Sequence, residues 1–154
     1  MPKRSAGLLL YRSVGDEVEV LIGHPGGPFW GSKDDGAWSV PKGEYVEGED
    51  PWQAAQREFD EELGMPAPNG DPVELGTIKQ PSGKVLTVFA VGADLDIAEA
   101  RSNTFELEWP KGSGRIRTFP EIDRVGWFPV DRARTKLLKG QVPFLDRLMQ
   151  HLAA

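Results

Sequence analysis

The segment from Gly43 to Met65 constrains the fold of this chain more than any other, because it marks both ends of a helix. Asp50 is a favourable N-cap residue, Pro51 suits the first helical position, and Gly64 can adopt the left-handed conformation that ends a helix. We therefore predict a helix over residues 51–63. The apolar face that it would turn to a sheet consists of Ala54, Ala55, Phe59 and Leu63.

Strand and helix patterns alternate along the rest of the chain. Short apolar runs bounded by glycine, proline and aspartate predict strands, and two later runs with helical spacing predict helices. The predicted strands cover residues 4–11, 17–23, 37–40, 73–79, 85–91, 104–109 and 125–128, and the predicted helices cover 131–138 and 142–151. This mixture indicates an α/β or α+β class with a mixed β-sheet between helices. We see no repeat or linker and expect a single domain over residues 1–154.

The composition excludes several kinds of function. A net charge of −6 argues against a stable complex with nucleic acid, which needs a basic face, although a bound metal can still attract a small anionic substrate. The chain has no cysteine, which removes disulfides, thiolate catalysis and zinc–thiolate sites. No apolar stretch is long enough to cross a membrane, and the run at residues 6–10 is too short for a secretory signal. We expect a cytoplasmic protein that is a monomer or a homodimer.

Three glutamates share one face of the predicted helix. Glu58 and Glu62 are four residues apart, and Glu61 follows Glu58 by three. Their mutual repulsion would weaken the helix unless a cation lies among them. Oxygen ligands without histidine or cysteine suit Mg²⁺ or Mn²⁺ rather than zinc. Gly43 lets the backbone approach closely, so its carbonyl is a further candidate ligand. A solvated acidic helix face is the structural alternative.

The spacing across this segment resembles the Nudix box. All seven fixed identities of that motif are matched, and they are Gly43, Glu49, Arg57, Glu58, Glu61, Glu62 and Gly64. Its two apolar positions are matched by Phe59 and Met65. The order of strands, and an aromatic pair followed by a final helix, are also similar to a Nudix hydrolase domain over nearly the whole chain.

The resemblance implies an α/β/α sandwich with a mixed sheet. It implies hydrolysis of a nucleoside diphosphate linked to another group, and a magnesium-dependent reaction in which the three helix glutamates carry the metal with help from the Gly43 carbonyl. Arg57 and Glu49 would form the ion pair of the box. From the residues alone, such a pair can hold the loop before the helix against the helix itself.

The general base is open to several candidates. Glu62 is one, because it belongs to the acidic face. Family members often use a glutamate well after the box, and Glu106 and Glu108 alternate with apolar residues on a predicted strand, so both can face one side. Glu121 is a weaker candidate, because an acid beside the final strand suits a structural role.

The substrate is expected to be a small nucleotide. Residues 38–43 resemble the W-x-x-P-K-G entry of diadenosine polyphosphate hydrolases, and Lys42 would add a cation for a phosphate-rich chain. Further side chains predicted to contact the substrate are Trp30, Lys79 and Trp109. These observations favour a nucleoside or dinucleoside polyphosphate.

Two alternatives stay open. Pro81 stands where ADP-ribose hydrolases carry a proline, which suggests an ADP-ribose or nucleotide-sugar pyrophosphatase, but Pro81 also suits a hairpin turn. A Nudix-like module that senses a nucleotide without cleaving it is the second alternative. Such modules usually lose box acids, whereas this chain retains them.

Overall fold

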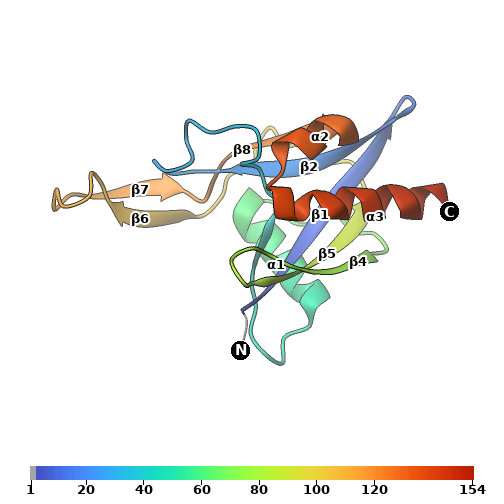
Figure 1. Cartoon of the computed structure of the whole chain (residues 1–154), viewed down its shortest axis with the longest axis horizontal. Coiled ribbons are helices and arrows are strands. Elements are labelled where there is room, and N and C mark those ends of the chain that lie inside the picture. Colours follow the sequence, from blue (N-terminus) through green and yellow to red (C-terminus); the bar gives the residue numbers. More distant parts are fainter. Residues whose placement is uncertain (1–2) are drawn as a thin grey trace.

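The computed structural model describes residues 3–154 and places a mixed sheet between helices (Figure 1). The main sheet has the order β4-β5-β1-β2-β8, and β3 pairs with β1 outside that path. Its strands are β1 (Arg4–Val14), β2 (Glu17–Pro25), β3 (Lys42–Glu44), β4 (Val73–Lys79), β5 (Val85–Gly92) and β8 (Ile122–Pro129). β1 runs parallel to β5 and antiparallel to β2 and β3.

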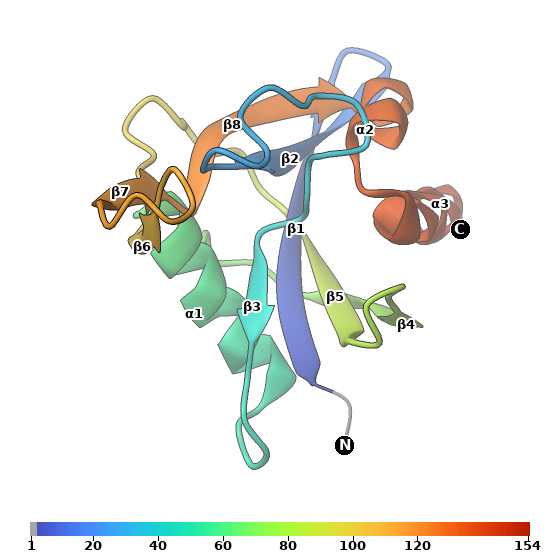
Figure 2. The ribbon, with the colours of Figure 1, turned by 60° about the vertical axis from the view of Figure 1, so that its left-hand side comes forward.

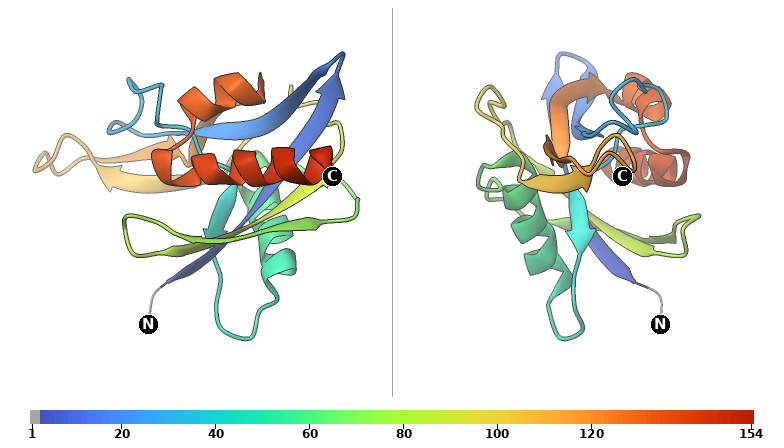
Figure 3. Two further views of the ribbon diagram at one scale, coloured as in Figure 1. Left: turned by 45° about the vertical axis from the view of Figure 1, so that its right-hand side comes forward. Right: turned by 90° about the vertical axis from the view of Figure 1, so that its left-hand side faces the viewer.

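The helices cover both faces of the sheet, as Figures 2 and 3 show. α1 (Pro51–Leu63) packs on one face, and α2 (Val130–Lys136), the short 3₁₀ helix η1 (Lys139–Gln141) and α3 (Val142–Ala153) lie on the other. Side chains alternate along β1, so that Leu8 and Leu10 join the core under α1 while Leu9 joins the opposite core. The predicted α/β/α sandwich is confirmed. Within residues 3–154, no helix combines the length and apolar character needed to cross a membrane.

The caps of α1 form as the sequence predicts. The Asp50 side chain accepts a hydrogen bond from the Gln53 amide at 3.1 Å. Gly64 adopts a φ of +65°, and its amide donates to the Asp60 carbonyl at 2.8 Å. The predicted helix and its buried apolar face are confirmed residue for residue. These two ends fix the register of the acidic residues relative to the sheet.

A separate hairpin stands beside the main sheet. β6 (Thr104–Glu108) pairs with β7 (Ile116–Pro120), and the pair projects away from the body (Figure 1). The hairpin packs on the loop after β2 at two places. The Phe105 ring covers Gly27 near the base, and the Trp109 ring, at the start of the turn, meets the Phe29 ring edge-on at 5.3 Å. The sequence did not predict β7, because nearly all of its side chains are exposed and no apolar face marks it.

Other boundaries differ from the predictions. The predicted strand over residues 37–40 is wrong, since Trp38 and Ser39 form only isolated bridges and the strand of this region is β3. The apolar residues there are buried by tertiary packing, which a pattern of side chains cannot distinguish from strand pairing. β8 begins three residues earlier than predicted, and α2 ends two residues earlier.

Candidate active site

Gly43 and Glu58 bring α1 against the edge strand β3. Gly43 pairs with Ala6, whose side chain lies in the core under α1. A β-carbon at Gly43 would overlap the Glu58 carboxylate, so the carboxylate fills the space that a side chain would take. Only glycine permits this approach. The Glu58 carboxylate therefore packs against the main chain of β3 at the edge of the sheet.

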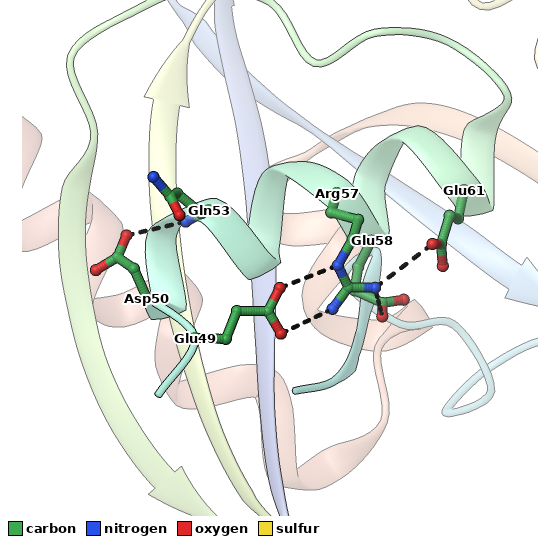
Figure 4. A network of polar contacts seen from close by, with 6 residues as sticks. All are labelled: Glu49, Asp50, Gln53, Arg57, Glu58 and Glu61. Atoms are coloured by element: carbon green, nitrogen blue, oxygen red, sulfur yellow. Dashed lines mark hydrogen bonds and ion pairs between the residues drawn. The ribbon is translucent and has the colours of Figure 1, made fainter. Parts of the chain in front are cut away.

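Arg57 organises the acids around it, as Figure 4 shows. Its Nε and Nη2 donate to the two carboxylate oxygens of Glu49 at 3.0 and 3.2 Å, which is a bidentate contact. Its Nη1 donates to Glu58 at 2.8 Å and, more weakly, to Glu61 at 3.4 Å. These bonds raise the pKa of the arginine. The predicted ion pair between Arg57 and Glu49 is present and ties the loop before α1 to the helix.

Glu62 makes a different contact, with the main chain of β3. One of its carboxylate oxygens accepts a hydrogen bond from the Lys42 amide at 3.3 Å. Burial raises the pKa of Glu62 to about 8, and the negative charges of Glu58 and Glu121 act in the same direction, while the positive charge and the amide of Lys42 oppose them. Burial also raises the pKa of Glu58, against the neighbouring guanidinium of Arg57. Both acids would ionise more readily beside a cation.

The donors fit a hard divalent cation, although they are not gathered around one point. Glu58, Glu61 and Glu62 offer only carboxylate oxygens, the ligands that Mg²⁺ and Mn²⁺ prefer. Among residues 3–154, no three acidic or histidine side chains already form a cluster that could hold a metal. Arg57 holds the first two glutamates, and the third faces an amide. Glu61 is exposed and its bond is long, so its carboxylate can rotate toward a cation. The ligand role of the Gly43 carbonyl stays a prediction.

Glu121, which lies outside α1 between β7 and β8, also acts on this cluster. Its charge contributes to the raised pKa of Glu62. A series of main-chain bonds places it there: the Asn103 amide donates to the Glu61 carbonyl, and the Glu121 amide donates to the Asn103 carbonyl. From the sequence Glu121 is a weaker candidate, because an acid beside the final strand suits a structural role, and its catalytic role stays a prediction.

Glu106 and Glu108 lie on the projecting hairpin. Both are exposed, and one Glu108 carboxylate oxygen accepts a hydrogen bond from the Gly112 amide at 2.6 Å, within the hairpin itself. They share one side of β6, as predicted, but neither contributes to the shifted pKa of Glu58 or Glu62. Their catalytic role stays a prediction.

The predicted substrate-binding residues fall in three places. Lys42 lines a cavity of about 510 Å³ on the sheet face opposite α1. Lys79 ends β4 and is exposed outside that cavity's lining. Trp30 and Trp109 belong to the loop and hairpin on the other side of the acids, where Trp30 is 36% exposed with the Lys33 ammonium 5.0 Å from its ring centre. The structure does not bring these four side chains together.

Buried polar contacts fix the loop that carries Trp30. His24 is fully buried, with its Nδ1 2.7 Å from an Asp123 carboxylate oxygen and its Nε2 facing the Lys33 carbonyl. Farther along the loop, the Asp34 carboxylate accepts a hydrogen bond from the Lys136 ammonium at 2.7 Å. These contacts hold the loop in a fixed position near the acids. The polar partners of the buried histidine could not be found from the sequence pattern alone.

Comparison with known proteins agrees with this arrangement. The family model for the NUDIX domain matches residues 1–152. A Caenorhabditis elegans protein, bis(5'-nucleosyl)-tetraphosphatase (asymmetrical), is 39% identical over 65 residues, which are 42% of this chain and 43% of that protein. The matched region thus spans less than half of that relative's length.

Solved structures show the same fold at low sequence identity. A C. elegans Ap4A hydrolase binary complex has a TM-score of 0.67 and 20% identity, covering 97% of this chain and 98% of the other. The NUDIX domain of Shewanella oneidensis NrtR, complexed with ADP ribose, also has a TM-score of 0.67, with 16% identity over 99% of this chain and 89% of the other. The family match over nearly the whole sequence, together with a box whose glycine, arginine and glutamates converge at the edge of the sheet, shows that the chain belongs to the Nudix family.

Proposed function

We propose that this Nudix protein is a Mg²⁺-dependent pyrophosphohydrolase that cleaves a nucleoside or dinucleoside polyphosphate by attack of water at phosphorus. The observation that carries the proposal is the crowding of Glu58 and Glu62 against β3. Burial raises the pKa of both carboxyls, and glycine at position 43 is required by the approach of one of them. A cation would relieve this unfavourable burial of acids.

The polar residues of α1 have two roles, which are binding the metal and orienting its ligands. Glu58, Glu61 and Glu62 would hold Mg²⁺, or Mn²⁺ in its place, with the Gly43 carbonyl as a further ligand. When bound, the metal neutralises the charge that builds on the phosphates and lowers the pKa of bound water. Arg57, which is anchored by its bidentate bond to Glu49, donates through Nη1 to Glu58 and Glu61 and would orient these two glutamates.

The proton of the attacking water needs an acceptor. Burial raises the pKa of Glu62 to about 8 in the metal-free protein, and a cation beside it would hold the carboxylate ionised, so Glu62 is one candidate acceptor. Glu121 is the alternative that the structure supports by its electrostatic proximity to Glu62. Glu106 and Glu108 remain candidates if the hairpin moves toward the acids when substrate binds.

A polyphosphate substrate is supported by Lys42 and by the partly matching relative. The Lys42 amide donates a hydrogen bond to Glu62, and the Lys42 side chain lines the large cavity, so this residue contacts both the acids and the cavity. The C. elegans relative is named for cleavage of a bis(5'-nucleosyl) tetraphosphate, and its matched region includes less than half of either chain.

One observation favours the second candidate, an ADP-ribose or nucleotide-sugar pyrophosphatase. Pro81 lines the large cavity as well as forming the turn after β4, so it is available to a ligand. The NrtR domain with the same fold is complexed with ADP ribose. A module that binds nucleotide without cleaving it is the third reading, and the retention of every box acid weighs against it.

A hydrolysis screen tests these readings together. Diadenosine polyphosphates, nucleoside triphosphates and ADP-ribose would each be incubated with the protein and Mg²⁺, with Glu62→Gln as the matched inactive control. We expect fastest turnover of a polyphosphate, abolished in the variant. Preferred cleavage of ADP-ribose would select the second candidate. Binding of a nucleotide without turnover of any substrate would refute the enzymatic proposal.

A further inference from the structure

The end of β2 lies against the connection between β7 and β8. Residues 24–27 of this end read His-Pro-Gly-Gly. The pairing of β2 with β8 changes register between His24 and Pro25. Irregularities of this kind bend a strand and turn its groups toward new partners. The partner here is the short segment that carries Glu121, which is the candidate acid from outside α1.

Main-chain hydrogen bonds hold Glu121 from two directions. Its amide donates to the Asn103 carbonyl at 2.9 Å, and the Asn103 amide donates to the Glu61 carbonyl in α1 at 3.0 Å. The carbonyl of Glu121 accepts a hydrogen bond from the Gly26 amide at 3.0 Å. Glu121 itself is exposed, so these main-chain bonds, more than burial, determine its position.

Two glycines allow the end of β2 to come this close. A β-carbon at Gly26 would overlap the Pro120 carbonyl oxygen, so only glycine fits there. A β-carbon at Gly27 would lie 2.9 Å from the Phe105 ring, and the φ of +97° at this residue also favours glycine. The end of β2 therefore packs main chain against main chain on the segment before β8.

His24 connects the same two segments through its side chain. The ring is fully buried, and its Nδ1 lies 2.7 Å from a carboxylate oxygen of Asp123. Its Nε2 faces the Lys33 carbonyl. A buried ring of this kind is costly unless its nitrogens have hydrogen-bond partners, so the contact with Asp123 stabilises the arrangement. Because Asp123 follows Glu121 by two residues, the ring anchors the start of β8 beside that acid.

We propose that His24 and Asp123 are positioning residues, which hold Glu121 in place beside Glu62 so that its carboxylate can act in the proposed reaction. The charge of Glu121 does reach Glu62, because it contributes to the raised pKa of that acid. The consequence for catalysis rests on the proposed hydrolase function. The positioning of Glu121 does not, because it needs neither metal nor substrate. The two statements can therefore fail separately.

The positioning is tested by hydrogen exchange of the Gly26 amide, followed by NMR in the metal-free protein. This amide reports on its own bond to the Glu121 carbonyl. Asp123→Ala removes the partner of the His24 ring and should raise the exchange rate about tenfold. Asp123→Asn keeps an oxygen for the ring and should stay within about threefold of the wild type.

A second variant keeps the test valid if Asp123→Ala does not fold. His24→Gln places an amide where Nε2 lies and leaves Asp123 without its partner, so the same rise in Gly26 exchange is expected. Unchanged exchange in the variants that lose the contact would overturn the proposal. A rise in Asp123→Asn as large as that in Asp123→Ala would overturn it as well.

Asp34→Ala is the matched control, because it releases the same loop at its other end. The Asp34 carboxylate accepts hydrogen bonds from the Lys136 ammonium at 2.7 Å and from the Trp38 indole at 2.8 Å. This contact does not include the connection between β7 and β8. The control should leave Gly26 exchange unchanged within about twofold. A rise equal to that in Asp123→Ala would show general loosening of the loop and would contradict a specific role of the His24 contact.

The consequence for catalysis is tested by a double-mutant cycle with Glu121→Gln. The substrate is the preferred one among diadenosine polyphosphates, nucleoside triphosphates and ADP-ribose. Asp123→Ala should lower kcat about tenfold and change KM less than about twofold, whereas Asp34→Ala should leave kcat within about twofold. In the Glu121→Gln background, Asp123→Ala should lower kcat less than about twofold, because the group that it positions is already lost.

The cycle also separates this proposal from a direct effect on the metal-binding acids. Asp123 and Glu62 line one small cavity of about 40 Å³, so Asp123 could act on Glu62 without Glu121. An undiminished effect of Asp123→Ala in the Glu121→Gln background, or an unchanged kcat in Asp123→Ala alone, would overturn the catalytic statement. If Gly26 exchange rises as expected but nothing is hydrolysed, the positioning of Glu121 stands and the proposed hydrolase function falls.

Discussion

Replacing Glu62 by glutamine should stabilise the metal-free protein at alkaline pH. The folded protein raises the pKa of this carboxyl from 4.5 to about 8, chiefly by burial. As the pH rises from about 4.5 to about 8, the unfolded chain releases this proton before the folded chain does, so folding loses stability. At about 1.4 kcal/mol for each unit of pKa, the upper limit of this loss is about 5 kcal/mol. Solvent reaches part of the side chain, and we expect about 1–3 kcal/mol.

The assay is urea unfolding in excess EDTA at about pH 5 and about pH 9. Glutamine keeps an oxygen for the Lys42 amide, so the variants differ in charge and hardly in shape. Stability of the wild type should fall between the two pH values more than that of Glu62→Gln. An exposed glutamate in the loop before α1, Glu47→Gln, serves as control and should not show this gain. An equal difference at both pH values, or a loss of stability in Glu62→Gln at about pH 9, would refute the reasoning.

Three further predictions concern Gly43, Gly64 and Glu121. Gly43→Ala places a methyl group on the carboxylate that packs there, so kcat should fall about 100-fold while the thermal midpoint of the metal-free protein shows that the fold persists. Gly64→Ala combines a left-handed conformation with an overlap on an opposing carbonyl and should cost about 2–4 kcal/mol in urea unfolding, whereas Gly48→Ala, left-handed but in open space, should cost about 1 kcal/mol. Glu121→Gln should lower kcat about tenfold more than Glu106→Gln, and the reverse order would identify the hairpin as the source of the base.

The parts of the fold that the sequence predicted well are those with local signals. Helix α1 has a capping aspartate, a proline at its first position and a glycine at its end, so its bounds follow from short-range chemistry. β4 and β5 are joined by a turn rich in proline and glycine, and they too lie where predicted. β7 and the isolated bridges at Trp38 and Ser39 depend on partners distant in sequence, which no local pattern reveals.

In the candidate site, too, contacts with a local signal were predictable and contacts between distant segments were not. The bond between Arg57 and Glu49 follows from their spacing around one helix, and the structure contains it. The place of Glu121 follows from main-chain bonds between segments far apart in the sequence, which no local pattern reveals. The lysines that line the large cavity, Lys42, Lys84 and Lys139, come from three separate elements and share no motif, so the sequence does not show that they line one cavity.

The hairpin of β6 and β7 is held at its base and by the contact between Trp109 and Phe29. Its base continues into the bonds that Asn103 and Arg101 make with the last turn of α1, while its tip carries Gly112 and Gly114 with open space around both. A peptide inserted between these two glycines would lengthen an exposed part of the turn and should leave the acids of α1 in place. The tip is therefore a natural position for an internal epitope or a fluorescent label, from which binding at the site could be followed without altering either terminus.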